Sequence, residues 1–299
     1  MSSFDQDPEK HVTSLADDAH LPRLTPGEYD RFRSLVREHT GIALGGDKQS
    51  LLEGRLSKRL RALGLASFAE YHHYLTLPAN ARELVFFADI VTTNKTDFFR
   101  EAHHFEFLAQ RWWPEHRAKD THKIRIWSAA CSSGEEPYTI AFTLLDALGL
   151  DARSWDFRIL ASDISTRVLE RAQSGLYALD RVTTVPHELL RRHFLRGTGA
   201  NEGFAQVRAD IRAAITFRRI NFMDDAWPIR TQFDVIFCRN ALIYFDRPTQ
   251  EAIVRKLLKH LSPGGYLVLG HSECIHGWFE ELEHLGNTIY RLRAPAPGA

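Results

Sequence analysis

The feature that most constrains the fold of this chain is a change in its hydrophobic pattern near residue 120. From residue 24 to about residue 90, apolar side chains recur at helical spacing, whereas the later part alternates strand-like apolar runs with helical stretches. The runs "KIRIWSAA" and "DFRILASD", for example, flank the helical stretch "EEPYTIAFTLLDAL". Alternation of this kind predicts a doubly wound α/β sheet, preceded here by a small helical bundle.

The first part of the chain carries clear signals for helix boundaries. Thr25 is the expected N-cap of a helix with Pro26 at its first position, and Ser67 is the expected N-cap of a later helix. A leucine-rich stretch ends at Gly64, a residue type that suits the end of a helix. The expected buried stripes are Tyr29, Phe32, Leu35 and Val36 in the first helix and Leu52, Leu56, Leu60 and Leu63 in the second.

Turn residues and short alternating runs interrupt the α/β pattern between about residues 178 and 215. We interpret this stretch as a small antiparallel β-subdomain inserted in the sheet domain. The predicted organisation is a disordered tail at 1–20, a helical domain at 21–90, a linker at 91–101, the sheet domain at 102–293 and a second disordered tail at 294–299.

The composition excludes several classes of protein. The formal net charge is zero, which gives no general reason to expect nucleic acid or membrane binding. Cys131, Cys238 and Cys274 have no paired short spacing, so they predict reduced thiols and not a disulfide frame or a zinc site. The N-terminus lacks a signal-peptide pattern, and no apolar run approaches the roughly 18 residues of a membrane span. We therefore expect a cytoplasmic protein.

The expected first strand ends in the turn "WSAACSSGEEPY", where α/β sheets bind nucleotides. Gly134 is the one glycine of this turn, whereas a pyrophosphate site needs G-x-G-x-x-G. The adjacent Glu135 and Glu136 disfavour an anion and favour a ligand with a cationic amino group. The alternative is that both carboxylates only complement the dipole of the following helix.

Three later strand ends carry polar residues. Asp163 ends the second strand, where it can accept hydrogen bonds from two ribose hydroxyls, or else cap the next helix. Together with the glycine-poor turn, it favours an adenosine ligand without pyrophosphate, namely S-adenosylmethionine. Asn221 suits the edge of an adenine. Arg239, Asn240 and Tyr244 follow another strand, where polar residues are often only turn formers. His271 and Glu273 lack a second pair of metal ligands, so we expect no metal site.

The stretch "VTTNKTDFFRE" precedes the sheet domain. On a helix, Thr96 and Arg100 would share one face, while Phe98 would join a buried stripe. The alternative is a plain helix start, with Asn94 as the N-cap and Asp97 as a variant of the capping-box acid. The rest of the expected stripe is Phe105, Leu108 and Trp112.

A basic cluster lies on the second expected helix, "EGRLSKRLRAL". Such a cluster is usually a solvated face. In a chain without net charge, however, it is also the best candidate for docking an acidic partner. Its members are Arg55, Lys58, Arg59 and Arg61.

Over about residues 24–293, the chain resembles the chemotaxis receptor methyltransferase (CheR) family. The motifs that carry the resemblance are, in their order along the chain, "TTNKTDFFRE", "WSAACSSGEEPYTIA", "ASDIS", "INF", "FDVIFCRNALIYFD" and "PGGYLVLGHSE". The resemblance implies a Rossmann-like enzyme domain. This domain would transfer methyl from S-adenosylmethionine to glutamate side chains on the cytoplasmic helical bundle of chemoreceptors and leave S-adenosylhomocysteine. The inserted β-subdomain resembles the one by which some members grip a peptide at the receptor's C-terminus.

The resemblance also implies roles for single residues. Asn94, Thr96 and Arg100 would contact the cofactor from the linker, and Arg100 and Tyr244 would lie next to the methyl group. One of Glu135 and Glu136, with Glu136 favoured, would contact the methionine part. The remaining implied contacts are Asp163 to the ribose, Asn221 and Phe222 to the adenine, and Arg239 and Asn240 to the far side of the cofactor.

The expected chemistry needs few catalytic groups. A glutamate carboxylate has an ordinary pKa of about 4.3, so it is ionised near neutral pH and needs no general base. Two other classes stay open on the residues alone. One is a signalling module that binds the cofactor without transferring methyl, and the other is a methyltransferase for nucleic acids or small molecules, for which the chain lacks an overall basic charge.

Overall fold

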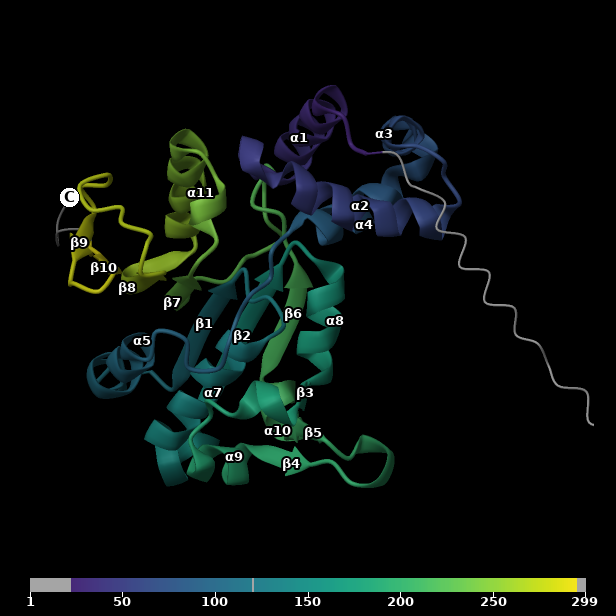
Figure 1. The fold of residues 1–299 in the computed structure, drawn as a ribbon. Helices are drawn as coiled ribbons and strands as arrows, with labels where there is room; N and C mark the ends of the chain where they lie inside the picture. Colours follow the sequence, from purple (N-terminus) through teal and green to yellow (C-terminus); the bar gives the residue numbers. More distant parts are fainter. Residues whose placement is uncertain (1–22, 120, 295–299) are drawn as a thin grey trace, which may run out of the picture.

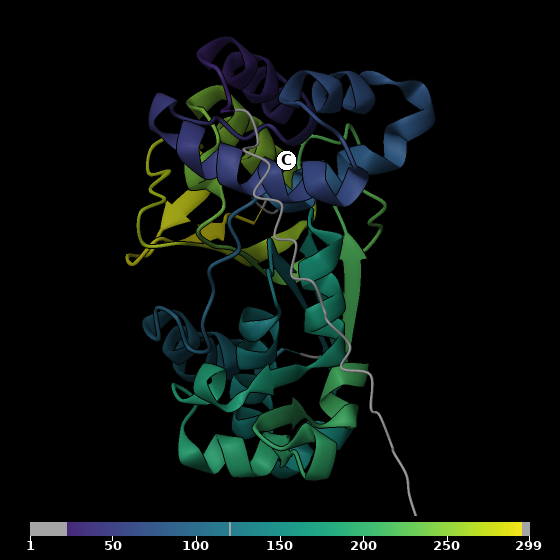
Figure 2. The same ribbon diagram turned by 45° about the vertical axis from the view of Figure 1, so that its right-hand side comes forward.

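The computed structural model describes residues 23–119 and 121–294 (Figure 1). The predicted tails at 1–20 and 294–299 lie outside these ranges, apart from Ala294. Four N-terminal helices lie at one end of a large sheet and a small second sheet lies at the other end, an arrangement that both Figure 1 and the turned view in Figure 2 show. Within the described ranges, no helix has the length and apolar character required to cross a bilayer.

The N-terminal helices begin and end where the sequence signals predict. Thr25 caps the first helix: its side chain accepts from the Glu28 N–H at 3.3 Å, and the Glu28 carboxylate accepts from the Thr25 N–H at 2.9 Å. Gly64 ends the second helix in the left-handed region and Ser67 caps the third. The helices are α1 (Pro26–Thr40), α2 (Gln49–Leu63), α3 (Phe68–Thr76) and α4 (Ala81–Val91), with 3₁₀ turns η1 (Gly46–Lys48) and η2 (Pro78–Asn80) between them.

These helices enclose a hydrophobic core of their own, centred on the aromatic side chains of Phe32, Phe68, Tyr71 and Phe87. The predicted stripes of both helices belong to it, although Leu63 is only partly buried. The bundle therefore has its own core and lies at one end of the sheet.

The large sheet has seven strands in the order β6-β2-β1-β7-β8-β10-β9. The first five strands of this order are parallel, and β10 is antiparallel to both of its neighbours. The predicted α/β class is confirmed, and the strand order reverses between β1 and β7, which is where such sheets bind ligands. The strands are β1 (Lys123–Ala129), β2 (Asp156–Asp163), β6 (Ile215–Arg219), β7 (Phe233–Cys238), β8 (Leu261–Leu269), β9 (Leu282–His284) and β10 (Ile289–Leu292).

Two apolar clusters cover the two faces of this sheet. On one face, Ile126 and Phe237 pack with Trp112 and Phe142, and on the other, Trp127 and Ile236 pack with residues such as Leu257. The predicted stripe Phe98, Phe105, Leu108 and Trp112 is buried in the first cluster. The helices involved are α5 (His103–Phe107), η3 (Leu108–Trp112), α6 (Trp113–Arg117), α7 (Glu135–Leu148), α8 (Thr166–Ser174) and α11 (Arg247–Lys259), with the 3₁₀ turn η4 (Gly149–Ser154) after α7.

The predicted β-subdomain is a separate antiparallel sheet in the order β3-β5-β4, inserted between α8 and β6. It begins at Leu176, slightly before the predicted residue 178, and the predicted end at residue 215 is the first residue of β6. Its inner side chains, including Tyr177 and Phe194, join the core of the large sheet. Its elements are β3 (Leu176–Ala178), η5 (Leu179–Val182), α9 (His187–His193), β4 (Phe194–Arg196), η6 (Gly199–Asn201), β5 (Phe204–Val207) and α10 (Ala209–Ala213).

Candidate functional site

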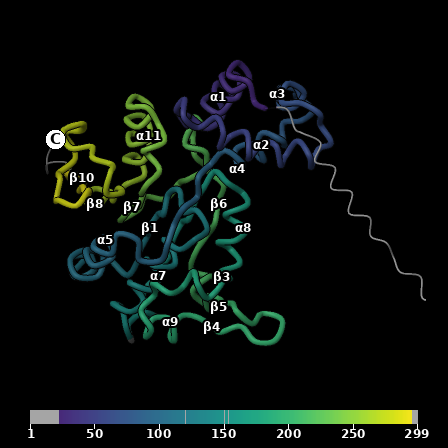
Figure 3. Tube along the Cα trace, in the orientation of Figure 1, coloured from purple at the N-terminus to yellow at the C-terminus, as the bar shows by residue number. Residues whose placement is uncertain are grey.

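A pocket lies at the carboxyl ends of β1, β2, β6 and β7, under the segment that joins α4 to α5. The tube in Figure 3 shows this linker passing from α4 across the sheet to α5. The pocket lining includes ten residues that the sequence pointed to: Asn94, Thr96, Arg100, Glu136, Asp163, Asn221, Phe222, Arg239, Asn240 and Tyr244. Tertiary structure thus gathers five separate sequence stretches into one site, and their individual roles stay predictions.

The linker itself is not helical, so the predicted helix start at Asn94 and the shared helical face of Thr96 and Arg100 are wrong. Residues 92–97 have no regular structure, residues 98–102 form turns, and α5 begins at His103. The physical reason is that side chains bind the carbonyl groups that a helix would use. The donors are Ser132 Oγ to Asn94 O (2.9 Å), Arg100 Nη1 to Lys95 O (3.0 Å), Arg181 Nη2 to Thr96 O (2.7 Å) and Thr184 Oγ1 to Phe98 O (3.0 Å).

Backbone strain is concentrated around this pocket. Residues other than glycine with positive φ occur in the linker at Phe99 and Glu101, after β1 at Ala130 and Ser132, and after β7 at Asn240. Each such residue costs on the order of 1–3 kcal/mol and persists only where its surroundings over-determine it. The three segments that line the pocket are therefore held in place by their contacts and not by local preference.

The structure separates the two adjacent glutamates that begin α7. Glu136 lines the pocket, where it accepts from Ser128 Oγ at 2.6 Å and from Arg239 Nη1 at 3.0 Å. Glu135 lies outside the lining, because its carboxylate binds Arg181 Nη2 and Ser133 Oγ, both at 2.7 Å. Of the two carboxylates, the pocket lining favours Glu136, as the resemblance does, and the contact of either one to the cofactor stays a prediction. Burial raises the pKa of Glu136, and Arg239 and Ser128 oppose this shift.

Asp163 is a buried carboxylate at the end of β2. Its Oδ1 accepts from the Ser165 N–H and its Oδ2 from the Ser132 N–H, both at 2.9 Å. Ser165, not Asp163, is the N-cap of α8, so the capping alternative is wrong. Burial raises the pKa of Asp163 to about 6 in spite of these donors. Each oxygen keeps a free lone pair, so the carboxylate can accept two neighbouring hydroxyl groups.

Asn221 and Phe222 follow β6, the strand next to β2, and also line the pocket. The Asn221 side chain donates to His39 O at 2.7 Å and accepts from the Met223 N–H at 3.0 Å. It therefore ties the end of α1 to the sheet and has one N–H and one lone pair left for a ligand. Phe222 with Phe245 supplies the apolar surface that a flat heteroaromatic ring needs.

Arg239 and Asn240 are held by Glu101, a residue that the sequence analysis did not select. The Glu101 carboxylate lies 3.2 Å from Arg239 Nη2 and accepts from Asn240 Nδ2 at 3.1 Å. Arg239 also donates to the Arg100 carbonyl, which joins the linker to the loop after β7. Burial raises the pKa of Glu101, but Asn240 and Arg239 outweigh it and leave the pKa lowered. The acidic residue directly after Arg100 in "FFRE" was the available signal.

The loop after β7 has a second support in Glu273, for which the sequence analysis expected no metal-binding role. Its carboxylate accepts from the backbone N–H groups of Asn240 and Gly270 at 2.7 Å and of Ile243 at 3.3 Å. Ile243 belongs to the 3₁₀ turn η7 (Leu242–Tyr244), so Glu273 also helps to place Tyr244. Its role is structural.

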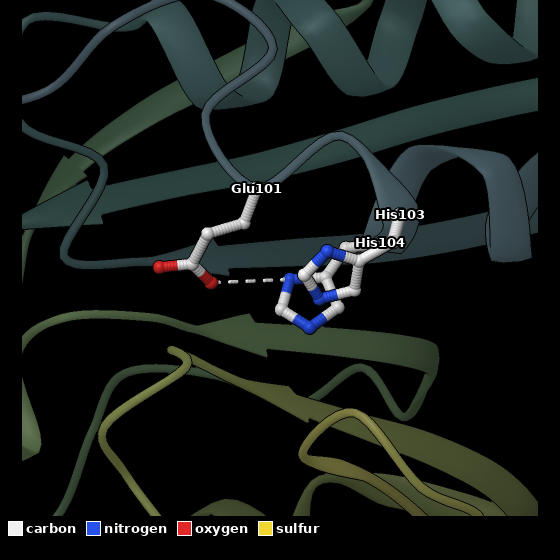
Figure 4. A group of neighbouring side chains, drawn as sticks. All are labelled: Glu101, His103 and His104. Atoms are coloured by element: carbon white, nitrogen blue, oxygen red, sulfur yellow. Dashed lines mark ion pairs between the residues drawn. The ribbon is translucent and has the colours of Figure 1, made fainter.

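Glu101, His103 and His104 form a group whose candidate ligand atoms lie within 4.8 Å of one another (Figure 4). His104 Nε2 donates to Asn287 O at 2.8 Å, and Nδ1 lies 3.5 Å from Glu101 Oε2. Burial, followed by the charge of Arg239, lowers the pKa of His104 to about 4. The geometry disfavours a metal ion, because Glu101 already accepts from Arg239, Asn240 and the His271 N–H. The guanidinium would also repel a cation.

In the basic cluster on α2, two residues make contacts within the helical domain and two are exposed. Arg55 Nη1 donates to the carbonyl groups of Ile90, Val91 and Thr92, and so completes the C-terminus of α4. Arg59 binds the buried Glu83 through both ends of its guanidinium, at 2.7 and 2.5 Å. Both arginines therefore hold the helical domain together, and their part in docking a partner stays a prediction. The exposed members of the cluster are Lys58 and Arg61.

Comparisons with known proteins agree with this arrangement. Residues 27–92 match the family model described as "CheR methyltransferase, all-alpha domain", and residues 94–291 match "CheR methyltransferase, SAM binding domain". Chemotaxis protein methyltransferase 2 of Pseudomonas aeruginosa is 43% identical over 271 residues, which cover 89% of this chain and 93% of that protein.

Two further relatives give the same result. The chemotaxis protein methyltransferase of Salmonella typhimurium is 42% identical over 269 residues, 90% of this chain and 91% of that protein. The protein of that name from Escherichia coli is 39% identical over 269 residues, 90% of this chain and 92% of that protein. The chain therefore belongs to the CheR methyltransferase family, and its sheet domain is the S-adenosylmethionine-binding domain of that family.

Proposed function

We propose that this protein transfers the methyl group of S-adenosylmethionine to glutamate side chains of the cytoplasmic helical bundle of chemoreceptors. The products are γ-methyl esters and S-adenosylhomocysteine. The observation that carries the proposal is the convergence of Asp163, Glu136, Arg100 and Tyr244 on one pocket at the switch point of the sheet. The names of the relatives, chemotaxis protein methyltransferases, support the pathway. The proposed reaction is cytoplasmic, because that is where this receptor region lies.

The pocket residues fit the cofactor by their donor and acceptor chemistry. Asp163 has spare lone pairs for the two ribose hydroxyls, and Glu136 offers a buried carboxylate to the cationic amino group. Phe222 offers an apolar face to the adenine. Arg239 lies 3.0 Å from Glu136 and opposes the rise in the pKa of this carboxyl that burial causes, so it favours the ionised form that a cationic amino group would bind.

When bound, S-adenosylmethionine supplies an electrophilic methyl group on a sulfonium. A carboxylate oxygen of the substrate forms a bond to the methyl carbon as the carbon–sulfur bond breaks, and no proton moves. The substrate glutamate is ionised near neutral pH, so the protein needs only to align it. Alignment of two reactants can lower a barrier by about 7–11 kcal/mol.

Arg100 and Tyr244 are the proposed aligning groups. Arg100 uses Nη1 to donate to Lys95 O and keeps other N–H groups for a carboxylate. Tyr244 lies where the two domains meet, because its carbonyl accepts from the Ala43 N–H at 2.8 Å. An incoming receptor helix would therefore meet both domains at the mouth of the pocket.

Two surfaces would bind the receptor outside the pocket. On α2, exposed Lys58 and Arg61 would attract an acidic helical bundle, while Arg55 and Arg59 keep the helix in place. On the β-subdomain, Leu195 and Phe204 expose 50% and 39% of their surface and could receive a receptor C-terminal peptide.

The test is incubation of the purified protein with radiolabelled S-adenosylmethionine and receptor cytoplasmic domains. We expect label in the receptor that base releases as methanol, and none when the acceptor glutamates are replaced by alanine. Binding of the cofactor in calorimetry without receptor labelling would instead indicate a signalling module. Label in added nucleic acid would indicate a different class of methyltransferase.

A further inference from the structure

Arg181, in η5 of the β-subdomain, reaches out of its own subdomain to the cofactor pocket. Its Nη2 donates to the Thr96 carbonyl and to Glu135 Oε1, both at 2.7 Å, and its Nη1 lies 3.6 Å from Asp97 Oδ1. Thr96 lines the pocket, and Glu135 directly precedes the pocket residue Glu136. One guanidinium thus joins the linker, the first turn of α7 and the β-subdomain.

The partner of Arg181 in α7, Glu135, is a buried carboxylate, so the ion pair between them is not an ordinary surface contact. Glu135 exposes only 1% of its side chain, and its other oxygen accepts from Ser133 Oγ. An ionised carboxylate at this depth needs a partner, and Arg181 is the cation that supplies it. The hydrogen bond to Glu135 is also the main cause of the raised pKa of Arg181.

Other side chains of the β-subdomain hold the same two segments. Thr184 Oγ1 donates to the Phe98 carbonyl at 3.0 Å, and the Tyr177 hydroxyl donates to the Ser133 carbonyl at 2.7 Å. The ring of Phe98 packs edge-on against those of Tyr177 and Phe194, at 5.0 and 5.7 Å between centroids. The linker lacks a helical or strand ladder here, so these contacts order it together with those from Ser132 and Arg239.

We propose that Arg181 is a positioning residue for the cofactor site, acting through the Thr96 carbonyl and the Glu135 carboxylate. The β-subdomain is then part of the scaffold of the pocket, in addition to any partner that it binds. Arg181 lies outside the pocket lining and acts only by holding Thr96 and the turn before α7. The inference rests on the cofactor site of the proposed function, but not on the identity of the methyl acceptor.

The test is calorimetric titration of the purified full-length protein with S-adenosylmethionine and S-adenosylhomocysteine, without receptor. We expect Arg181→Ala to raise the Kd of both about tenfold, because one side-chain removal unpairs a buried carboxylate and frees a carbonyl. In turnover assays the KM for S-adenosylmethionine should rise in parallel, while kcat at saturating cofactor and the KM for receptor change less than about twofold. Arg191→Ala is the matched control, since this arginine of α9 exposes 70% of its side chain.

Two further variants separate positioning from a general loss of stability. Arg181→Lys keeps the positive charge, but its single ammonium group cannot replace all the N–H groups of the guanidinium. It should recover about half of the binding free energy that Arg181→Ala loses. Glu135→Gln removes the buried charge, so combining it with Arg181→Ala should cost less than the sum of the two single effects. An unchanged Kd in Arg181→Ala, or strictly additive effects in the double variant, would overturn the proposal. Wild-type binding without receptor methylation would contradict only the proposed function.

Discussion

Two stretches of this protein have the same local helix-start pattern but different structures. At Thr25, a capping residue followed three positions later by Glu28 starts α1, with both reciprocal hydrogen bonds present. At Asn94, a capping residue followed three positions later by Asp97 starts no helix, and residues 92–97 have no regular structure.

The difference lies in where the backbone carbonyl groups find their donors. In α1 they bind N–H groups four residues later in the same helix. In the linker, side chains from the turn after β1 and from the β-subdomain bind them instead. A capping pattern therefore predicts a helix only where no distant side chain competes for its carbonyls. In this protein such competition occurs at the pocket.

The largest expected effect comes from the linker side of this comparison. Arg100→Ala should lower kcat for receptor methylation by about 10²–10³-fold, because it removes the charged donor that, in the proposed function, aligns the reacting carboxylate. The measurement is turnover at saturating cofactor, with thermal unfolding as the control for folding. A variant that methylates receptor at the normal rate would rule out Arg100 as the group that aligns the reacting carboxylate.

Asp163 provides the next largest effect and a pH dependence. In the proposed cofactor site, ribose hydroxyls would donate to the ionised Asp163 carboxylate, so cofactor affinity should be full above the pKa of about 6 and fall as the pH drops below it. In the unliganded protein the raised pKa has the opposite consequence: the stability that it contributes is present at low pH and is lost as the pH rises through about 6.

Asp163→Asn should therefore weaken cofactor binding about tenfold at pH 7.5 and flatten its pH profile. Calorimetry between pH 5 and pH 8 measures both effects. If the variant keeps the same pH profile as the wild type, the titrating group is not Asp163.

A smaller effect should distinguish the two halves of the basic cluster on α2. The double variant Lys58→Glu with Arg61→Glu should raise the KM for receptor about fivefold, more strongly at low salt, and leave cofactor affinity unchanged. Arg59→Ala should instead lower the free energy of unfolding, because it leaves Glu83 buried and unpaired. Arg117→Glu on α6, an exposed arginine away from α2, is the control for charge. An unchanged KM in the double variant would exclude this face as a docking surface.

The smallest effect tests the opening comparison directly. Thr25→Ala should lower the free energy of unfolding by about 1 kcal/mol, the typical cost of losing an N-cap, with no change in cofactor affinity. Asn94→Ala should instead weaken cofactor binding and leave the free energy of unfolding unchanged, since Asn94 lines the pocket and caps no helix. Thermal unfolding and calorimetry on both variants complete the comparison, and equal losses of stability would contradict it.

Much of the site could be predicted from residue types at strand ends. Asp163, Asn221 and Arg239 follow three parallel strands, and the carboxyl ends of such strands meet at one edge of the sheet. Glu101 could not be found in this way, because its importance comes from Arg239 and Asn240, which lie far along the chain. The same reason explains why the sequence could not settle the choice between Glu135 and Glu136: Arg181, which holds Glu135 outside the pocket lining, belongs to the inserted subdomain.

The sequence by itself determined the α/β class, the caps and stripes of the N-terminal helices and the gathering of polar residues at the strand ends. These features depend on periodicity and on contacts within a few residues, which a sequence displays directly. The tertiary structure alone decided the shape of the linker, the separation of Glu135 from Glu136 and the structural use of Arg55 and Arg59. Each of these depends on hydrogen bonds between residues that are distant in the chain. A buried charge or carbonyl needs a hydrogen-bond partner, and only the tertiary structure determines which residue lies close enough to be that partner.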